Sequence, residues 1–156
     1  MPHIHDLIDN TVSAYIVHKR SVLLIDHKAL KKWLPIGGHI ELNEDPEEGL
    51  FREILEEAGI KASELEVLGE KPRFSSEGTK FLYPPAYLDL HDISATHKHI
   101  GMTYFLKSNT DQIRLAEGEH NGIEWVSLQE LGDPKFSLSP AVRFYAQEAI
   151  HRLGWD

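Results

Sequence analysis

The sequence contains no cysteine. This absence excludes disulfide bonds, thiolate zinc sites and cysteine nucleophiles from the fold and from the chemistry. Long apolar runs are also missing, since no stretch approaches the roughly 18 residues that cross a bilayer. The N-terminal segment MPHIHDLIDN lacks a basic region followed by an apolar one, the pattern of a secretory signal. We therefore expect the chain to stay in the cytoplasm and to have no membrane partner.

Basic residues are scarce. The chain has 16 Lys and Arg against 25 Asp and Glu, for a net charge of -9. With no cluster of basic residues to follow a phosphate backbone, polymeric nucleic acid is not an expected partner. The apolar share of 41% and the length of 156 residues are typical of one globular unit with a real core. We expect a single domain over residues 1–156.

Hydrophobic patterns and turn signals predict six strands and two helices. The expected strands cover residues 11–17, 21–25, 64–68, 81–90, 100–106 and 122–128, and the expected helices cover about 46–58 and 140–153. Asp45, Pro46 and Glu48 form a capping signal before the first helix, and Gly59 marks its end. Strands mixed with only two helices favour an α/β fold of the α+β type, in which helices cover both faces of a mixed sheet.

The acidity of the chain is local. Eight acids lie between Glu41 and Glu57, against Arg52 as the one base. On a helical wheel Glu53, Glu56 and Glu57 share one face, and no basic residue falls in that arc. Like charges so close are destabilising unless a cation neutralises them, although a solvated helix face is the alternative interpretation. Carboxylates beside a glycine loop provide the hard oxygen ligands that Mg²⁺ or Mn²⁺ select.

The same segment resembles a complete Nudix box. The matching positions are Gly38, then Glu44 after five residues, then, after seven more, Arg52, Glu53, Ile54, Leu55, Glu56, Glu57, Ala58, Gly59 and Ile60. The surrounding strands and residues 125–131 resemble the rest of a Nudix domain. The resemblance implies an α/β/α sandwich with a loop-helix-loop metal site. It also implies hydrolysis of a nucleoside diphosphate linked to another group, a small-molecule substrate.

The resemblance also implies roles for individual residues. Glu56 and Glu57 are the expected metal ligands, direct or through water, with a possible further ligand in the carbonyl of Gly37 or Gly38. Glu53 is expected to be a ligand or a base. Arg52 is expected to orient these carboxylates by pairing with Glu44 or Glu56, although a simple surface pairing along the helix is equally compatible with its position.

Nudix enzymes commonly take one more carboxylate from a loop before the strand that contains a late tryptophan. In the segment EGEHNGIEW, Glu119 is the first candidate and Glu117 the second. A solvated loop acid is the alternative for each. We expect Glu119 to join the catalytic and metal-binding residues.

Two further groups are candidates for substrate binding. His97 and His99 alternate along an expected strand, so both project from one face, and His91 precedes them. Such histidines could bind metal, donate to phosphate or act as a base, but the sequence shows no third zinc ligand beside them. Arg73 and Phe74 lie in a stretch that mixes cations with aromatic rings, which suits phosphate binding and base stacking, although an ordinary surface loop fits as well.

Two other functions remain as alternatives. A catalytically silent Nudix-fold module could bind a nucleotide as a sensor, but such modules are expected to lose acids of the box, and none is missing here. The isopentenyl diphosphate isomerase branch needs cysteine chemistry, which this chain cannot provide. The substrate stays open, because the residues 15 to 18 positions beyond the box, Ser75 to Gly78, match no substrate-specific pattern.

Overall fold

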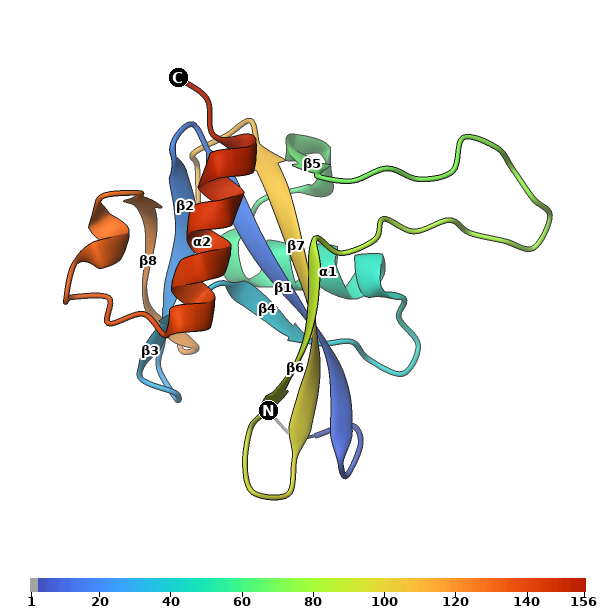
Figure 1. Cartoon of the computed structure of the whole chain (residues 1–156), viewed down its shortest axis with the longest axis horizontal. Helices are drawn as coiled ribbons and strands as arrows, with labels where there is room; N and C mark the ends of the chain where they lie inside the picture. Colours follow the sequence, from blue (N-terminus) through green and yellow to red (C-terminus); the bar gives the residue numbers. More distant parts are fainter. Residues whose placement is uncertain (1–2) are drawn as a thin grey trace.

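The computed structural model describes residues 3–156; residues 1 and 2 of the expected domain lie outside the described part. A mixed sheet lies between two helices, α1 (Pro46–Ala58) and α2 (Pro140–Leu153), which cover opposite faces (Figure 1). This arrangement confirms the predicted fold class. Within residues 3–156, no helix is both long and apolar enough to cross a membrane.

Within the described residues, the sheet has eight strands. They are β1 (Ile8–His18), β2 (Ser21–His27), β3 (Lys32–Leu34), β4 (Ile36–His39), β5 (Leu65–Val67), β6 (Tyr87–Asp92), β7 (Lys98–Ser108) and β8 (His120–Ser127). The long strands β1 and β7 pair in parallel, and the other pairs are antiparallel. Two short 3₁₀ helices cover Ala62–Glu64 and Glu130–Gly132.

Two sequence predictions of strands need correction. The strand expected over 81–90 begins only at Tyr87, because Pro84 and Pro85 have no backbone N–H to donate to a neighbouring strand. The short strands β3 and β4 were not predicted, since three or four residues are too few to show an alternating pattern and two of the four in β4 are glycines. β4 matters for function because it carries Gly37 and Gly38.

Helix α1 has the predicted bounds, and its capping groups account for them. The Asp45 carboxylate accepts from the Glu48 amide at 2.9 Å, and the Glu48 carboxylate accepts from the Asp45 amide at 3.3 Å. Gly59 ends the helix in the left-handed region at φ 71°, where its amide donates to the Leu55 carbonyl. These caps fix the first and last residues of the helix.

Alternation along β1 divides the core into two parts. Val12, Ala14 and Ile16 pack with Leu50 and Ile54 of α1. The intervening side chains point to the other face, where Tyr15 and Val17 pack with residues of α2 that include Ala146 and Ile150. Even positions of β1 therefore face α1, and odd positions face α2.

Candidate active site

Two carboxylates of α1 are buried against β4. Glu53 and Glu57 each expose only 4% of their surface. The Gly37 amide donates to Glu57 Oε1 at 3.0 Å. A Cβ atom at Gly38 would lie 2.3 Å from Glu53 Oε1, so only glycine leaves room for that carboxylate. The two glycines of β4 thus allow the close approach of both acids, one by donating its amide and one by having no side chain.

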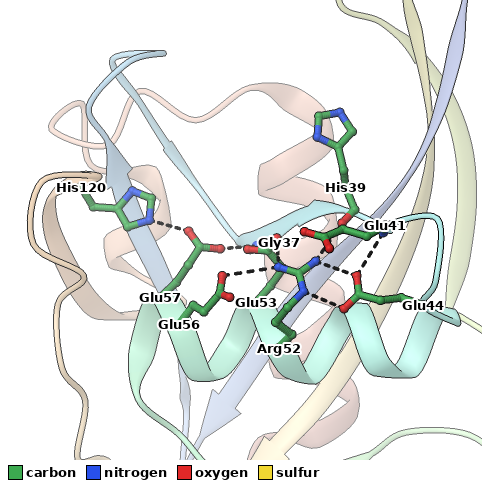
Figure 2. A network of polar contacts seen from close by, with 9 residues as sticks. All are labelled: Gly37, His39, Glu41, Glu44, Arg52, Glu53, Glu56, Glu57 and His120. Atoms are coloured by element: carbon green, nitrogen blue, oxygen red, sulfur yellow. Dashed lines mark hydrogen bonds and ion pairs between the residues drawn. The ribbon is translucent and has the colours of Figure 1, made fainter. Parts of the chain in front are cut away.

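Arg52 connects the acids of the loop with those of the helix (Figure 2). Its guanidinium donates twice to Glu44, at 2.7 and 2.9 Å, and once to Glu53, at 2.9 Å. It also donates to Glu56 at 3.4 Å and to the His39 carbonyl at 3.1 Å. The helical wheel treated the acidic face as uncompensated. This prediction was incomplete, because the long Arg52 side chain extends over the acidic face of the helix and reaches Glu53 and Glu56.

His120 is a site residue that the sequence reasoning missed. It is the first residue of β8, which pairs with β2, and it is 6% exposed. Its Nε2 atom contacts Glu57 Oε2 (Figure 2). Ligand atoms of Glu57, Glu119 and His120 all lie within 4.8 Å of one another, with Glu119 exposed. The available signal was its position directly after Glu119, at the start of the strand that contains Trp125.

Burial dominates the electrostatics of the paired acids. Burial, with Glu57 close by, raises the pKa of Glu53 to about 8 despite the opposing hydrogen bond from Arg52. Burial likewise raises the pKa of Glu57 to about 7, although the Gly37 amide opposes the shift. Burial lowers the pKa of His120. All three shifts favour the uncharged forms, so the site without a cation resists holding its full negative charge.

The arrangement matches a known family. A family model described as the NUDIX domain matches residues 8–147. The chain belongs to the Nudix family. A crystal structure of a NUDIX-family hydrolase from Clostridium perfringens is 32% identical, with a TM-score of 0.78, and covers 92% of this chain and 97% of its own. The protein is therefore a Nudix hydrolase.

Less similar structures share the fold. The Ap4A hydrolase of C. elegans, in a binary complex, is 19% identical with a TM-score of 0.63, covering 90% of this chain and 93% of its own. The NUDIX domain of Shewanella oneidensis NrtR, complexed with ADP ribose, is 16% identical with a TM-score of 0.66, covering 96% and 90%. No curated protein matches the sequence.

The donors of this Nudix box fit a hard divalent cation. The candidate ligands are oxygen atoms: the carboxylates of Glu53, Glu56, Glu57 and Glu119, and the carbonyls of Gly37 or Gly38. Glu56 is well placed for an ion at the surface, because its side chain is 58% exposed. A nearby cation would stabilise the charged forms of Glu53 and Glu57 and so lower their raised pKa values. The chemistry of the donor atoms and the electrostatics of the site therefore both fit a divalent cation.

The predicted substrate-binding residues Arg73 and Phe74 of this Nudix hydrolase lie outside the carboxylate site. Arg73 and Phe74 are exposed in the long segment between β5 and β6, which projects from the body of the molecule (Figure 1). Phe74 packs against Phe81, with ring centroids 5.0 Å apart. Lys71 and Lys80 of the same segment pair with Glu47 and Asp45 at the start of α1. The carboxylates occupy the other half of that helix, so a role for Arg73 or Phe74 remains a prediction.

Three more residues predicted from the sequence are Glu117, His97 and His99. Glu117 is exposed in the loop that also carries Glu119. His97 is buried at 4% exposure and His99 is partly buried. His97 directly precedes β7 and His99 is its second residue, and both belong to a separate group with His3 and Asp9. Their predicted contact with substrate stays a prediction.

The raised carboxyl pKa values predict how the metal-free Nudix hydrolase responds to pH. Between about pH 6.5 and 8, its free energy of unfolding should fall as the pH rises. Glu53 and Glu57 bind protons more tightly in the folded state, at pKa values of about 8 and 7, than in the unfolded chain at the ordinary 4.5. The folded state therefore holds more protons in this range, and raising the pH removes that advantage.

Denaturant unfolding in chelator, at pH 6.5 and pH 8, measures this effect. The range starts at 6.5 because histidines such as His99, whose ordinary pKa is 6.5 and whose folded pKa is lower, act in the opposite direction below it. Glu53→Gln should flatten the dependence. Stability that stays constant or increases from pH 6.5 to 8 in the wild type would contradict the assigned electrostatics.

Proposed function

We propose that this Nudix hydrolase uses Mg²⁺ or Mn²⁺ to cleave a phosphoanhydride bond in a nucleoside diphosphate linked to another group, or in a nucleoside triphosphate. The observation that carries the proposal is the pair of buried carboxylates, Glu53 and Glu57, held beside exposed Glu56 and Glu119. Glu53, Glu56, Glu57 and Glu119, with a carbonyl of Gly37 or Gly38, would hold the ion. Bound there, it would supply positive charge against the phosphate oxygens and lower the pKa of the attacking water.

Hydrogen bonds from other residues of the chain fix the positions of the carboxylates in this site. Arg52 aligns the carboxylates of Glu53 and Glu56 through hydrogen bonds to both. The Gly37 amide and His120 hold the two oxygens of Glu57 in fixed directions. Fixed donors and ligands would place one phosphorus in line with the attacking water, which is how positioning lowers the barrier of phosphoryl transfer.

Two carboxylates are candidates for the proton acceptor. Glu53 is buried, and one of its oxygens already accepts a hydrogen bond from Arg52. Glu119 is exposed, and its ligand atom lies within 4.8 Å of those of Glu57 and His120. Glu119 is the better placed of the two to reach a water molecule, because it is exposed, whereas Glu53 is buried and already holds Arg52.

A small hollow beside the box is compatible with a small-molecule substrate. It has a volume of about 270 Å³ and lies between the loop before α1 and strand β7. Its lining includes Glu44, the partner of Arg52, together with Asn10, Ile40 and Met102. The apolar wall suits a ring, whereas Glu41 and Glu44 would repel a phosphate chain unless a cation lay between them.

The products of hydrolysis test the proposal. The panel consists of ADP-ribose, other nucleotide sugars, dinucleoside polyphosphates, NADH and nucleoside triphosphates, including oxidised ones, each with and without an added phosphatase. A nucleoside-diphosphate-linked substrate should yield two phosphomonoesters, and a triphosphate should yield a monophosphate and pyrophosphate. Orthophosphate should therefore be released only when the phosphatase is present. Cleavage of simple phosphomonoesters as the best activity would contradict the proposal.

A further inference from the structure

A second group of ligating side chains lies on the face of the sheet opposite α1. Asp9 is an odd-numbered residue of β1, so it faces the α2 side. The parallel register of β1 and β7 places His99 beside it, and His97 projects from the same side as His99. His3 comes from the segment before β1. Ligand atoms of His3, Asp9, His97 and His99 all lie within 4.8 Å of one another.

The centre of this group is a buried carboxylate. Asp9 is 1% exposed, and its Oδ1 accepts from the His5 amide at 2.7 Å. Its Oδ2 lies 3.3 Å from His3 Nδ1 and 3.2 Å from both His39 Nε2 and His97 Nε2. Burial raises the pKa of Asp9, but backbone hydrogen bonds and the neighbouring histidines outweigh burial, and the net shift is downward. The carboxylate is therefore a stable anion.

His97 has the hydrogen bonding of a metal ligand. Its Nδ1 lies 3.0 Å from the carbonyl oxygen of Asp6, which only accepts, so Nδ1 carries the proton. In the neutral ring, Nε2 then presents a lone pair. That atom is buried, lies 3.2 Å from Asp9 Oδ2 and makes no hydrogen bond within residues 3–156. Two electron-rich atoms at this distance repel each other unless a proton or a metal ion lies between them, and a backbone carbonyl behind the ring is the usual support for a ligating histidine.

His99 completes the nitrogen donors. Its Nε2 lies 3.3 Å from His39 Nε2, and the rings of His97 and His99 are 5.2 Å apart. Burial, together with the surrounding histidines, lowers the pKa of His99 to about 4. One ring nitrogen of His99 lies within 4.8 Å of the ligand atoms of His3, Asp9 and His97, so the same ion could reach all four side chains.

We propose that His3, Asp9, His97 and His99 bind a Zn²⁺ ion at a site separate from the Nudix box. Three imidazole nitrogens and one carboxylate oxygen suit the tetrahedral preference of zinc, whereas Mg²⁺ selects oxygen ligands. The ion would link the segment before β1 to the start of β7, two parts of the protein that are distant in the sequence. Its role is to stabilise this end of the sheet, because binding to the folded state alone raises the free energy of unfolding.

Metal titration of the full chain, with any polyhistidine tag removed, tests the proposal. The protein is stripped of metal and titrated with Zn²⁺ by calorimetry and with Co²⁺ by visible absorption. We expect one equivalent of Co²⁺ with the intense spectrum of four-coordinate cobalt, displaced by Zn²⁺, and a higher unfolding temperature with zinc. The same binding should persist in Glu57→Gln, which alters the Nudix box. Its loss in Glu57→Gln would place the ion in the box and overturn the proposal.

A matched pair of variants identifies the ligands. His3→Gln should weaken Zn²⁺ binding at least about tenfold, because an exposed ligand is removed without disturbing the core. His5→Gln should leave binding unchanged, since only the backbone amide of His5 contacts Asp9. Asp9→Asn adds a test at the centre of the group. Equal affinity in His3→Gln and His5→Gln, or wild-type affinity in folded Asp9→Asn, would overturn the proposal.

Discussion

Glu57→Gln should lower kcat more than about 100-fold while leaving the fold intact, since even outer-shell partners of a metal ligand contribute about 10–100-fold. The substitution removes the charge that an ion would need, but it keeps the shape. Glutamine can still accept from the Gly37 amide and can donate to His120. Because burial opposes the charged form of Glu57, the metal-free variant should be at least as stable as the wild type. Steady-state kinetics and thermal unfolding in chelator measure the two effects.

Matched controls separate this effect from a general loss of acidity. Glu66→Gln changes an exposed acid of β5 and should leave turnover unchanged. In the loop before β8, Glu119→Gln should lower turnover and Glu117→Gln should not. Turnover near that of the wild type in Glu57→Gln would show that the metal site has been misplaced.

Gly38→Ala should also lower turnover, on the order of 10–100-fold, by moving a carboxylate that it does not replace. The new Cβ would lie 2.3 Å from Glu53 Oε1, so the carboxylate must shift away from its place beside Arg52. The obstacle is the end of a flexible side chain, and stability should therefore change little. Kinetics, with the free energy of unfolding measured in parallel, test both parts of this prediction.

The neighbouring glycine provides a sharp contrast. A Cβ at Gly37 would lie 2.2 Å from the Val12 carbonyl oxygen, a backbone atom that cannot move without disturbing β1. Gly37→Ala should therefore reduce the free energy of unfolding by about 1–3 kcal/mol, the usual range for overpacking. Gly132→Ala is the control, since nothing lies within 4 Å of its Cβ position. If Gly38→Ala keeps full activity, the position of Glu53 is not critical.

The sequence was most informative where the relevant spacing is local. The caps at Asp45 and Gly59 set the bounds of α1, and the 3.6-residue period placed Glu53, Glu56 and Glu57 on one face. The wheel could not show that Arg52 reaches Glu53 and Glu56, because that depends on the length and conformation of a side chain. Nor does periodicity along one helix distinguish buried Glu57 from exposed Glu56.

Long-range pairing accounts for what the sequence did not reveal. His120 meets Glu57 only because β8 pairs with β2, and such pairing between distant segments leaves no local pattern. The sequence showed no third zinc ligand beside His97 and His99, which lie at the junction between a loop and β7. Asp9 joins them through the parallel register of β1 and β7, which links residues about 90 positions apart. Local signals thus predicted the helix of the box, and sheet topology determined its partners.

Turnover of the best substrate of the panel before and after exhaustive removal of metal tests the central claim most directly. The claim is that the carboxylates of the Nudix box act through a divalent cation. Turnover should fall to background in chelator and should return when Mg²⁺ alone is added in excess. Glu57→Gln should stay inactive under the same addition. Full turnover in metal-free wild-type protein, on any substrate found, would contradict the account.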